Sequence, residues 1–405
     1  MAARSRRAAP PLFKTIVLSS RATLHRNLPG ALFPERLAPE DMKRLRDKVC
    51  DAAMAQPGVL GREAVLLKSG DAMFDMRAAE MAAVGALTPA FAEHGPGTAL
   101  LLDNAGAAIV VNDEDHATVT SHGPQGLDEH VKRVRAVAKS LEKRLPFARH
   151  PDYGYLSANP DNIGAGLRLY VSFCFFGLFL DKEIDAVLRG IERIGLAVYP
   201  LYASSEKEEG PLEAPGCCYV VASTQTMGPE SHILSGMLRV CHELEMAEAN
   251  ARLRLVESRP GVLIDFLARS VAVGCFAAQM GESEGLDIIH AVLFGLDMGA
   301  FSLPPEGVSA AHDLTLGMTH AGLRRLVDLP EPEKPAAASA LPVGAPDAEA
   351  AAYEPFRAAR AYLLRQFSTL LLPQCAEKFG YRAVVEEMQT GEARRPRKKR
   401  MEDPA

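Results

Sequence analysis

The sequence of 405 residues contains no tryptophan, no Cys-x-x-Cys pair and no long apolar run. Its longest apolar run, 171–180, covers about half of a membrane span of about 20 residues and predicts a buried helix. The seven cysteines are odd in number and scattered, which excludes a disulfide framework and favours a reducing, cytoplasmic location. The N-terminus lacks the apolar core of a secretory signal. We therefore expect no membrane partner, no zinc site and no other metal site built by the protein.

The chain also has no excess of positive charge. The formal net charge is -6 and the pI is near 6.0, which argues against nucleic acid as the main partner of the folded body. The basic run 394–400 predicts a solvated tail, with nucleic acid or an acidic partner as the alternative. With 48% hydrophobic and 24% charged residues, the chain is typical of a globular protein long enough for two domains.

The hydrophobic pattern changes from mixed to helical along the chain. Apolar residues spaced three or four apart predict helices over 39–55, 127–145, 183–194 and most of 231–327. Shorter apolar runs predict strands over 13–18, 99–102, 107–111, 196–202 and 218–222. The turn 103–106 predicts a hairpin, which places residues 112–116 just after the end of a strand. Strands followed by helices indicate an α+β domain and then an all-helical one.

Six segments follow from this pattern. They are a basic leader (1–12), a catalytic domain (13–259), a helical domain (260–329), a linker rich in proline and alanine (330–352), a C-terminal helical segment (353–390) and a basic tail (391–405).

Two short stretches carry the chemistry. The first, Asn-Asp-Glu-Asp-His at 112–116, packs three carboxylates and an imidazole into five residues, a set that binds a cation or accepts a proton. The second, 159–168, is rich in turn residues and leads to Arg168, whose guanidinium suits a phosphate. A cluster like the first is usually a solvated turn on its own. Together the two stretches indicate phosphoryl transfer to a guanidinium group.

The chain resembles the ATP:guanidino phosphotransferases, the family of arginine and creatine kinases, and above all their bacterial protein-arginine-kinase branch. The landmarks occur in family order over roughly 14–330, and they are 16–21, 26–27, 33–34, 111–116, 153–157, 159–168, Tyr219, 226–228, Asp265, 269–270 and 295–299. The resemblance implies an antiparallel sheet flanked by helices, a helical C-terminal domain that dimerises, ATP with Mg2+ as cofactor and a protein substrate or partner.

The resemblance also assigns site residues. Glu114 matches a catalytic glutamate that orients the guanidinium and accepts its proton. Arg21 and Arg168 match two phosphate-binding arginines, and Ser19 and Ser20 belong to the same cofactor-binding motif as Arg21.

Other family positions are substituted here. Thr23, Thr118 and Tyr199 stand where the family has phosphate-binding arginines. Asn159 replaces a reactive cysteine and Gly85 a nucleotide-contacting histidine. Ser204 stands at the second glutamate, for which Glu206 or Glu208 is the open alternative.

These losses leave two functions open, a weakened protein-arginine kinase and an inactive pseudokinase that serves as a binding or regulatory module. The family's phosphoarginine-sensing motif survives only in part at 356–361.

Overall fold

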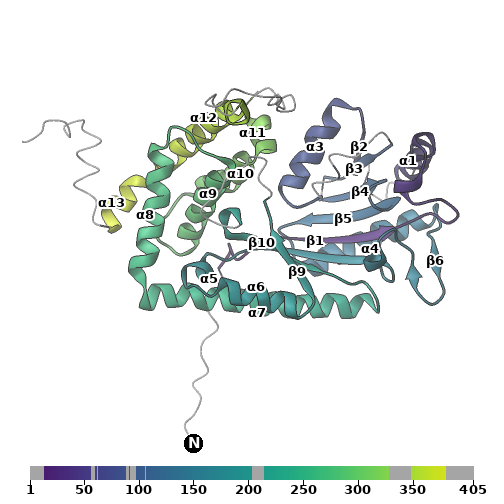
Figure 1. Ribbon diagram of the computed structural model, residues 1–405, viewed down its shortest axis with the longest axis horizontal. Coiled ribbons are helices and arrows are strands. Elements are labelled where there is room, and N and C mark those ends of the chain that lie inside the picture. The colour runs from purple at the N-terminus through teal and green to yellow at the C-terminus, as the bar shows by residue number, and fades with distance from the viewer. Residues whose placement is uncertain are drawn as a thin grey trace, which may run out of the picture.

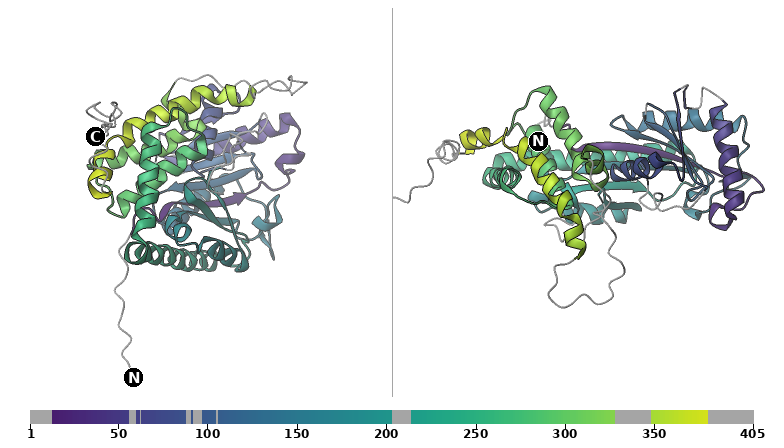
Figure 2. Two further views of the ribbon diagram at one scale, coloured as in Figure 1. Left: turned by 60° about the vertical axis from the view of Figure 1, so that its left-hand side comes forward. Right: turned by 90° about the horizontal axis from the view of Figure 1, so that it is seen from above.

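The computed structural model describes residues 13–55, 60, 61, 63–87, 91, 97–104, 106–202, 214–327 and 348–379. A sheet occupies one half of the molecule and helices the other, and the two halves lie side by side along the long axis (Figure 1, Figure 2). This is the α+β fold with a helical C-terminal region that the sequence predicted. The described helices include none long and apolar enough to cross a membrane.

The sheet has eight strands, and every neighbouring pair is antiparallel. In sheet order they are β2 (Val65–Lys68), β3 (Ala99–Leu102), β4 (Ala107–Val111), β5 (Ala117–Gly123), β1 (Val17–Arg26), β8 (Leu167–Cys174), β10 (Cys218–Ser223) and β9 (Leu196–Pro200). A separate small ribbon pairs β6 (Arg149–His150) with β7 (Gly154–Tyr155). Three 3-10 turns are η1 (Pro34–Arg36), η3 (Pro160–Asn162) and η4 (Pro215–Cys217).

Helices flank the sheet and then build the second half. Those of the first half are α1 (Pro39–Met54), α3 (Ala72–Ala83), α4 (Leu127–Glu142), α5 (Phe176–Leu180) and α6 (Ile184–Arg193). Those of the second are α7 (Glu230–Ser258), α8 (Pro260–Phe276), α9 (Glu282–Asp297), α10 (Pro305–Met318), α11 (His320–Leu326), α12 (Ala348–Ser368) and α13 (Leu372–Phe379). The long helix α7 runs from the sheet to the helical half along one edge of the molecule (Figure 1).

The two faces of the sheet differ in chemistry because side chains alternate along each strand. In β1, Ala22 and Leu24 are buried on the face that α4 covers, and they join the main apolar core. The alternating residues Arg21, Thr23 and His25 lie on the other face, which we call the site face. A polar stripe in the middle of an otherwise apolar sheet therefore marks a place where a ligand can be held.

A buried polar network joins the two halves. The guanidinium of Arg252, which is 0% exposed, donates to Glu248 at 2.7 Å and to Asp297 at 2.9 Å. Asp297 also accepts from the backbone N–H of Lys14 and Thr15, each at 3.0 Å. The N-terminal segment, α7 and α9 are thereby fixed to one another.

Most predicted elements are confirmed, and two are wrong in part. The strand predicted over 13–18 begins only at Val17 and continues to Arg26 as β1. The hairpin of β3 and β4, the helices α1, α4 and α6 and the strand β10 follow the predicted ranges closely. The apolar run 171–180 is not one helix, because its first four residues end β8 and only Phe176–Leu180 is helical. A central strand that is apolar on both faces gives the same pattern as a buried helix.

Several predicted segments cannot be placed. The leader 1–12, the tail 391–405 and most of the linker lie outside the described residues.

Candidate active site

The turn 112–116 joins β4 to β5 and sets the position of Glu114. Asn112 has a φ of 55°, in the left-handed region that asparagine tolerates better than most residues. Its buried Nδ2 donates to the backbone oxygens of Met42 at 2.9 Å and of Gly97 at 2.8 Å. These bonds fix the start of the turn against α1, so the acidic residues that follow have a defined direction.

Asp115 and His116 hold the turn in place and face away from solvent. Asp115 is 0% exposed and accepts from His25 at 3.0 Å, from the backbone N–H of Ala158 at 2.9 Å and from Ser157 at 2.8 Å. Burial alone would raise the pKa of Asp115, but the hydrogen bonds from His25, Ala158 and Asn27 outweigh it and lower the pKa.

The ring of His116 is equally fixed. Its Nδ1 accepts from the backbone N–H of Leu28 at 3.0 Å, and its Nε2 lies 2.7 Å from the carbonyl oxygen of Leu32. Burial lowers the pKa of His116, so the ring is neutral at pH 7. Neither Asp115 nor His116 is free to act as an acid or base on a ligand.

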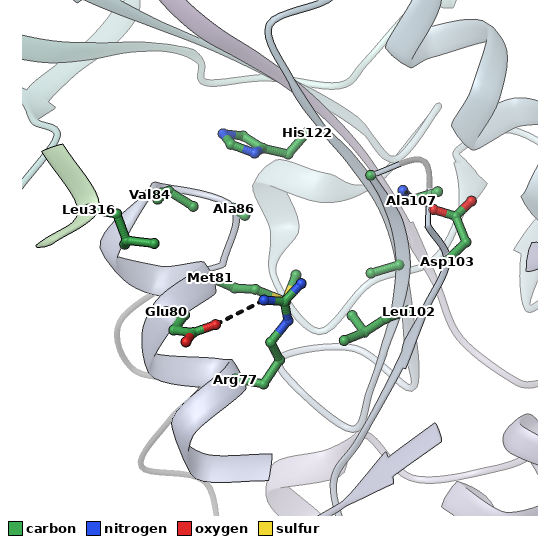
Figure 3. A pocket seen from close by; sticks show the side chains of 12 residues that line it. Arg77, Glu80, Met81, Val84, Ala86, Leu102, Asp103, Ala107, His122 and Leu316 are labelled. Carbon is green, nitrogen blue, oxygen red and sulfur yellow. Dashed lines mark hydrogen bonds and ion pairs between the residues drawn. The ribbon is translucent and has the colours of Figure 1, made fainter. Parts of the chain in front are cut away.

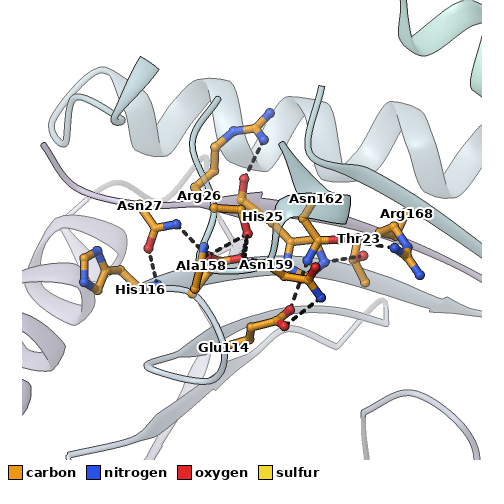
Figure 4. Close-up of polar contacts among 12 residues, drawn as sticks. Thr23, His25, Arg26, Asn27, Glu114, His116, Ala158, Asn159, Asn162 and Arg168 are labelled. Atoms are coloured by element: carbon orange, nitrogen blue, oxygen red, sulfur yellow. Dashed lines mark hydrogen bonds and ion pairs between the residues drawn. The ribbon is translucent and has the colours of Figure 1, made fainter. Parts of the chain in front are cut away.

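Glu114, unlike Asp115, remains available. Its Oε1 accepts from Asn159 Nδ2 at 2.9 Å and its Oε2 from Asn162 Nδ2 at 3.0 Å (Figure 4). The two asparagines come from the loop that contains η3, so the structure joins the two stretches that the sequence singled out. An ionised carboxylate has about four acceptor sites, so two remain after these two bonds. Glu114 is thereby held in one orientation while it keeps the capacity to bind a guanidinium.

Arg21 and Arg168 lie close together on the site face. Thr23 pairs with Arg168 across β1 and β8, and Arg21 pairs with Tyr170 two residues further along. Diagonal neighbours of this kind are about 7–8 Å apart in an antiparallel pair. The guanidinium of Arg21 stacks on the ring of Tyr170, with its Cζ 3.8 Å from the ring centroid.

Arg168 connects this pair of cations to Glu114. Its Nη1 donates to the backbone oxygen of Thr224 at 3.0 Å and lies 3.4 Å from Asn162 Oδ1 (Figure 4). These contacts include no ion pair with Asp113 or Asp115. Such a pair would have given Arg168 a purely structural role. Asn162 therefore touches both the carboxylate and one guanidinium.

The three positions that the resemblance matches to family arginines lie on the same face. Thr23 stands between Arg168 and Thr120 across the sheet, and Thr118 pairs with His25. Tyr199 of β9 reaches the same face through Val220 and is 42% exposed. Burial raises the pKa of Tyr199, while the positive charges of Arg21 and Arg168 oppose the shift, as expected for near neighbours.

The polar atoms of the site face fit an anionic group. Four buried atoms here have no hydrogen-bond partner in the described part of the chain, and they are Arg21 Nε, Arg168 Nε, Thr118 Oγ1 and Thr120 Oγ1. Buried donors of this kind normally have partners, and phosphate oxygens would supply them. The residues thus fit the phosphates of ATP, although with two guanidinium charges only. Asp115 is saturated with hydrogen bonds, so Mg2+ would depend on the phosphates and on Glu114.

The structure separates the two predicted serines. The hydroxyl of Ser19 lies 3.2 Å from His122 Nε2 on the site face. Ser20 points to the opposite face, where its hydroxyl donates to the backbone oxygen of Gln125 at 2.7 Å. Gly85 follows α3 with a φ of 73°, and a Cβ at this position would meet Leu201 Cδ1 at 2.9 Å. Ser204, Glu206 and Glu208 lie outside the described residues, so the second carboxylate stays a prediction.

A neighbouring pocket of about 190 Å³ lies between α3 and the strands β3 and β4 (Figure 3). His122 lines it, and an ion pair joins Arg77 to Glu80 at 2.9 Å on its helical wall. Neither Glu114 nor Arg168 lines this pocket. Burial and the charge of Arg21 lower the pKa of His122 to about 4, so the pocket is lined by a neutral imidazole at pH 7.

Sequence reasoning missed the roles of His25 and Asn162. His25 bridges Thr23 and Asp115, with distances of 3.2 Å and 3.0 Å from its two ring nitrogens. The alternation of Arg21, Thr23 and His25 with apolar residues is a strand pattern that could have placed all three on one face. No comparable signal identifies Asn162, because its contact with Glu114 depends on the path of a loop.

Comparisons with known proteins agree with this geometry. The family model described as ATP:guanido phosphotransferase, C-terminal catalytic domain, matches residues 60–251. A protein-arginine kinase of Halothermothrix orenii is 29% identical over 299 residues, which cover 73% of this chain and 82% of that protein. A protein-arginine kinase of Bacillus subtilis is 27% identical over 288 residues, which cover 70% of this chain and 77% of that protein.

One solved structure shows the same fold. The duplicated taurocyamine kinase from Schistosoma mansoni, with bound transition state analog components, aligns with a TM-score of 0.51 and 18% identity. The alignment covers 73% of this chain and 40% of that longer, duplicated one.

The antiparallel sheet, the carboxylate beside two guanidiniums and these matches define the class of protein that the chain is similar to: residues 60–251 match the ATP:guanido phosphotransferase family. Among curated proteins, the chain is similar to the protein-arginine kinases of Halothermothrix orenii and Bacillus subtilis.

Proposed function

We propose that this protein transfers the γ-phosphoryl group of MgATP to arginine side chains of a protein substrate at a much reduced rate. The observation that carries the proposal is the carboxylate of Glu114, held by two asparagine amides beside Arg21 and Arg168. This arrangement supports the proposal because a carboxylate that could bind a guanidinium lies next to donors suited to phosphate.

Glu114 would bind the substrate guanidinium through its remaining acceptor sites. Two parallel N–H to O bonds between a guanidinium and a carboxylate give both energy and direction. The carboxylate then accepts the proton that the attacking nitrogen loses, the part of a general base. Asn159 and Asn162 keep its plane fixed throughout, so little reorganisation is needed.

Arg21 and Arg168 would hold the phosphates. MgATP supplies the phosphoryl group when bound, and phosphoryl transfer depends mainly on positioning and on neutralising the phosphate oxygens. Stacking on Tyr170 keeps the guanidinium of Arg21 flat against the sheet, and Thr224 anchors that of Arg168. The hydroxyls of Thr118 and Thr120 offer further donors at the same face.

The rate would be low because three family arginines are replaced. A hydrogen bond to a charged group contributes about 1.5–3 kcal/mol, so three lost contacts remove up to about 5–9 kcal/mol before non-additivity. Hydroxyl groups at Thr23 and Thr118 restore only part of this. We expect turnover well below the rate of about 1–100 per second that is usual for kinases.

Mass spectrometry that preserves phosphoarginine tests the proposal directly. Wild type and Glu114→Gln are incubated with MgATP and an arginine-rich protein substrate, and phosphoarginine is counted against time. We expect slow transfer by wild type and a loss of about 10²–10⁴-fold in Glu114→Gln, because the variant keeps the shape and removes the base. Glu129→Gln, an exposed position on α4, is the matched control. Equal transfer by wild type and Glu114→Gln would contradict the proposal.

A second candidate is a pseudokinase that serves as a binding or regulatory module. The loss of three cations from the site face favours it. The remnant of the phosphoarginine-sensing motif gives it no support, because Arg360 is 0% exposed and its Nε donates to the backbone oxygen of Met318 at 2.9 Å. Calorimetry with MgATP separates the candidates: micromolar binding favours the kinase, and no binding together with no transfer favours the module.

We also propose, from the similarity to the protein-arginine kinases, that the protein acts as a homodimer in the cytoplasm. The helical half would supply the contact. Four apolar side chains of α8 are exposed in the single chain, and they are Val262, Ile264, Val273 and Phe276. The apolar face of α9 gives no such support, since Ile288, Ile289, Val292 and Leu293 are buried within the chain.

A further inference from the structure

Two cysteines and a histidine converge at the junction between the sheet and the helical half. Cys174 ends β8, Cys218 begins β10, and the two residues are direct cross-strand partners. His290 reaches them from α9. The two sulfurs and one imidazole nitrogen all lie within 4.8 Å of one another, and the three residues are at most 3% exposed.

A tight turn lets the helix approach the strands this closely. Gly216 of η4 has a φ of 67°, and a Cβ at this position would lie 2.5 Å from His290 Cδ2 and 3.1 Å from Cys218 Sγ. Its backbone N–H donates to Asp287 at 2.6 Å, one turn before His290 on α9. Only glycine fits here, so the backbone itself brings the imidazole against the thiols.

Tyr202 completes the group. Its hydroxyl oxygen lies 2.8 Å from His290 Nε2, and both thiols are close enough to influence the ionisation of the phenol. Tyr202 therefore adds an oxygen atom beside the imidazole of the three-residue group. Both thiols also lie near a single carbonyl oxygen, that of Gly216, at 3.1 Å for Cys218 and 3.6 Å for Cys174.

This donor set suits Zn2+. Structural zinc sites are tetrahedral and use cysteine sulfur and histidine nitrogen. Soft thiolate ligands discriminate against Mg2+ and Ca2+, which prefer oxygen. Two thiolates also cancel the charge of the dication, which matters because an uncompensated charge is costly in a buried place.

We propose that Cys174, Cys218 and His290 bind one zinc ion, with the Tyr202 oxygen beside the fourth position. Binding forms two S–Zn bonds and one N–Zn bond, and the two thiol protons pass to solvent.

An entry route exists beside the cluster. A pocket of about 270 Å³ is lined by Tyr202 and His290 and also by His312 of α10 and Lys14. The ion would therefore reach His290 from the side of the pocket. The histidine pair His290 and His312 also gives a hydrated ion a first contact on the way in.

The cysteine spacing along the sequence predicted no zinc site, and the reason lies in the chain path. Cys174, Cys218 and His290 are separated by about 40 and about 70 residues, so no short motif contains them. The sheet register brings the two cysteines together, and the packing of α9 adds the histidine. This inference does not depend on the proposed kinase function.

Metal analysis of the full chain tests the inference. The protein is purified without chelator, and zinc per chain is measured by plasma mass spectrometry. We expect about one zinc per chain in wild type and a loss of most of it in Cys174→Ser and in His290→Ala. Cys217→Ser is the matched control: this thiol is buried and adjacent to Cys218 in sequence but is not part of the cluster, so its zinc content stays at the wild-type level.

Cobalt gives a second readout that does not depend on any variant folding. Wild type is stripped with a chelator and titrated with Co2+, and we expect a thiolate-to-cobalt charge-transfer band together with the visible bands of tetrahedral cobalt. Wild type without zinc and without these bands would overturn the inference. A Cys174–Cys218 disulfide found by mass spectrometry of non-reduced peptides from the freshly purified protein would overturn it as well.

Discussion

Glu114 and Asp115 are adjacent in sequence and differ completely in environment. Asp115 is fully buried and takes all its hydrogen bonds from the protein, whereas Glu114 accepts one bond on each oxygen and is only partly buried. Local sequence identified the acidic cluster, yet it could not say which carboxylate faces the site. The difference comes from β1 and from the loop before β8, whose residues His25, Ser157 and Asn159 are distant in sequence.

Tyr199→Arg is predicted to restore part of the nucleotide affinity. Tyr199 is 42% exposed on the site face, so an arginine fits there without repacking. One added charged contact is worth about 1.5–3 kcal/mol, which corresponds to about a tenfold or greater gain in MgATP affinity. Titration calorimetry measures it. Leu238→Arg, also 42% exposed but on α7, adds the same charge elsewhere and should leave the affinity unchanged. An equal gain in both variants would mean that net charge alone is responsible.

Arginine substitutions at the two buried positions, Thr23 and Thr118, should behave differently from Tyr199→Arg. Thr23 and Thr118 are 5% and 6% exposed, so an arginine at either would need its neighbours to move. Overpacking of this kind usually costs about 1–3 kcal/mol. Restoring all three arginines should therefore strengthen nucleotide binding and weaken the fold together.

His122→Gln is predicted to change how stability depends on pH. Burial and the charge of Arg21 lower the pKa of His122 to about 4, whereas an unfolded histidine has a pKa of about 6.5. Between these values the unfolded chain binds a proton that the folded chain does not. The free energy of unfolding therefore falls as pH decreases from about 6.5 to about 4. Urea unfolding across this window should show a smaller fall in His122→Gln, while His242→Gln at an exposed site should match wild type.

At the scale of elements, the strand register decides which residues meet. The β3–β4 hairpin was predictable because its turn, Asp103 to Gly106, carries ordinary turn residues between two apolar runs. The length of β1 was missed, because the predicted strand ended at residue 18, although the alternation of polar and apolar residues from Arg21 onward is itself a strand pattern. The end of β8 was mistaken for a helix because both of its faces are buried. The partners of Glu114 were unpredictable, as they depend on the pairing of β1, β8 and a loop.

Arg252→Met is predicted to weaken the contact between α7, α9 and the N-terminal segment. Arg252 is fully buried between Glu248 and Asp297, so its removal leaves two buried carboxylates without their cation. Breaking a buried pair in this way typically costs about 3–5 kcal/mol. Chemical denaturation gives the free energy of unfolding. Arg254→Met removes a guanidinium that is 43% exposed where it pairs with Asp181 and Glu183, so it should cost less, about 0–1 kcal/mol. If both variants lost a similar free energy of unfolding, the Arg252 network would not be a main contact between these segments.

At the scale of the whole molecule, two groups of side chains join the sheet half to the helical half. One is the Arg252 network, and the other is the cluster of Cys174, Cys218 and His290. The Arg252 network connects α9 to the segment that leads into β1. The cluster connects α9 to the strands β8 and β10. The sequence predicted two domains, and it gave no sign of the residues that connect them, because Arg252 and Asp297, like Cys174 and Cys218, are more than 40 residues apart.

Phe276→Asp is predicted to convert the proposed homodimer into a monomer. Phe276 is 56% exposed at the end of α8, beside other exposed apolar side chains of that helix. A buried charge without a partner in the contact would cost several kcal/mol. Light scattering at micromolar concentration measures the mass of wild type and variant. Leu370→Asp, 59% exposed after α12, is the control and should stay dimeric. A monomeric wild type would refute the proposed assembly.

Every cysteine of the chain is buried, and the side chain beside Glu114 that the resemblance matches to a reactive cysteine is the amide of Asn159. Burial raises the pKa of Cys50 and Cys275 to about 11, so these sulfurs stay protonated and unreactive at neutral pH. With all seven cysteines buried, the folded protein exposes no thiol on its surface to alkylating agents or to peroxide. Phosphoryl transfer by this chain would be insensitive to oxidative stress, and a single cysteine placed on its surface would be the one position that a maleimide dye can label.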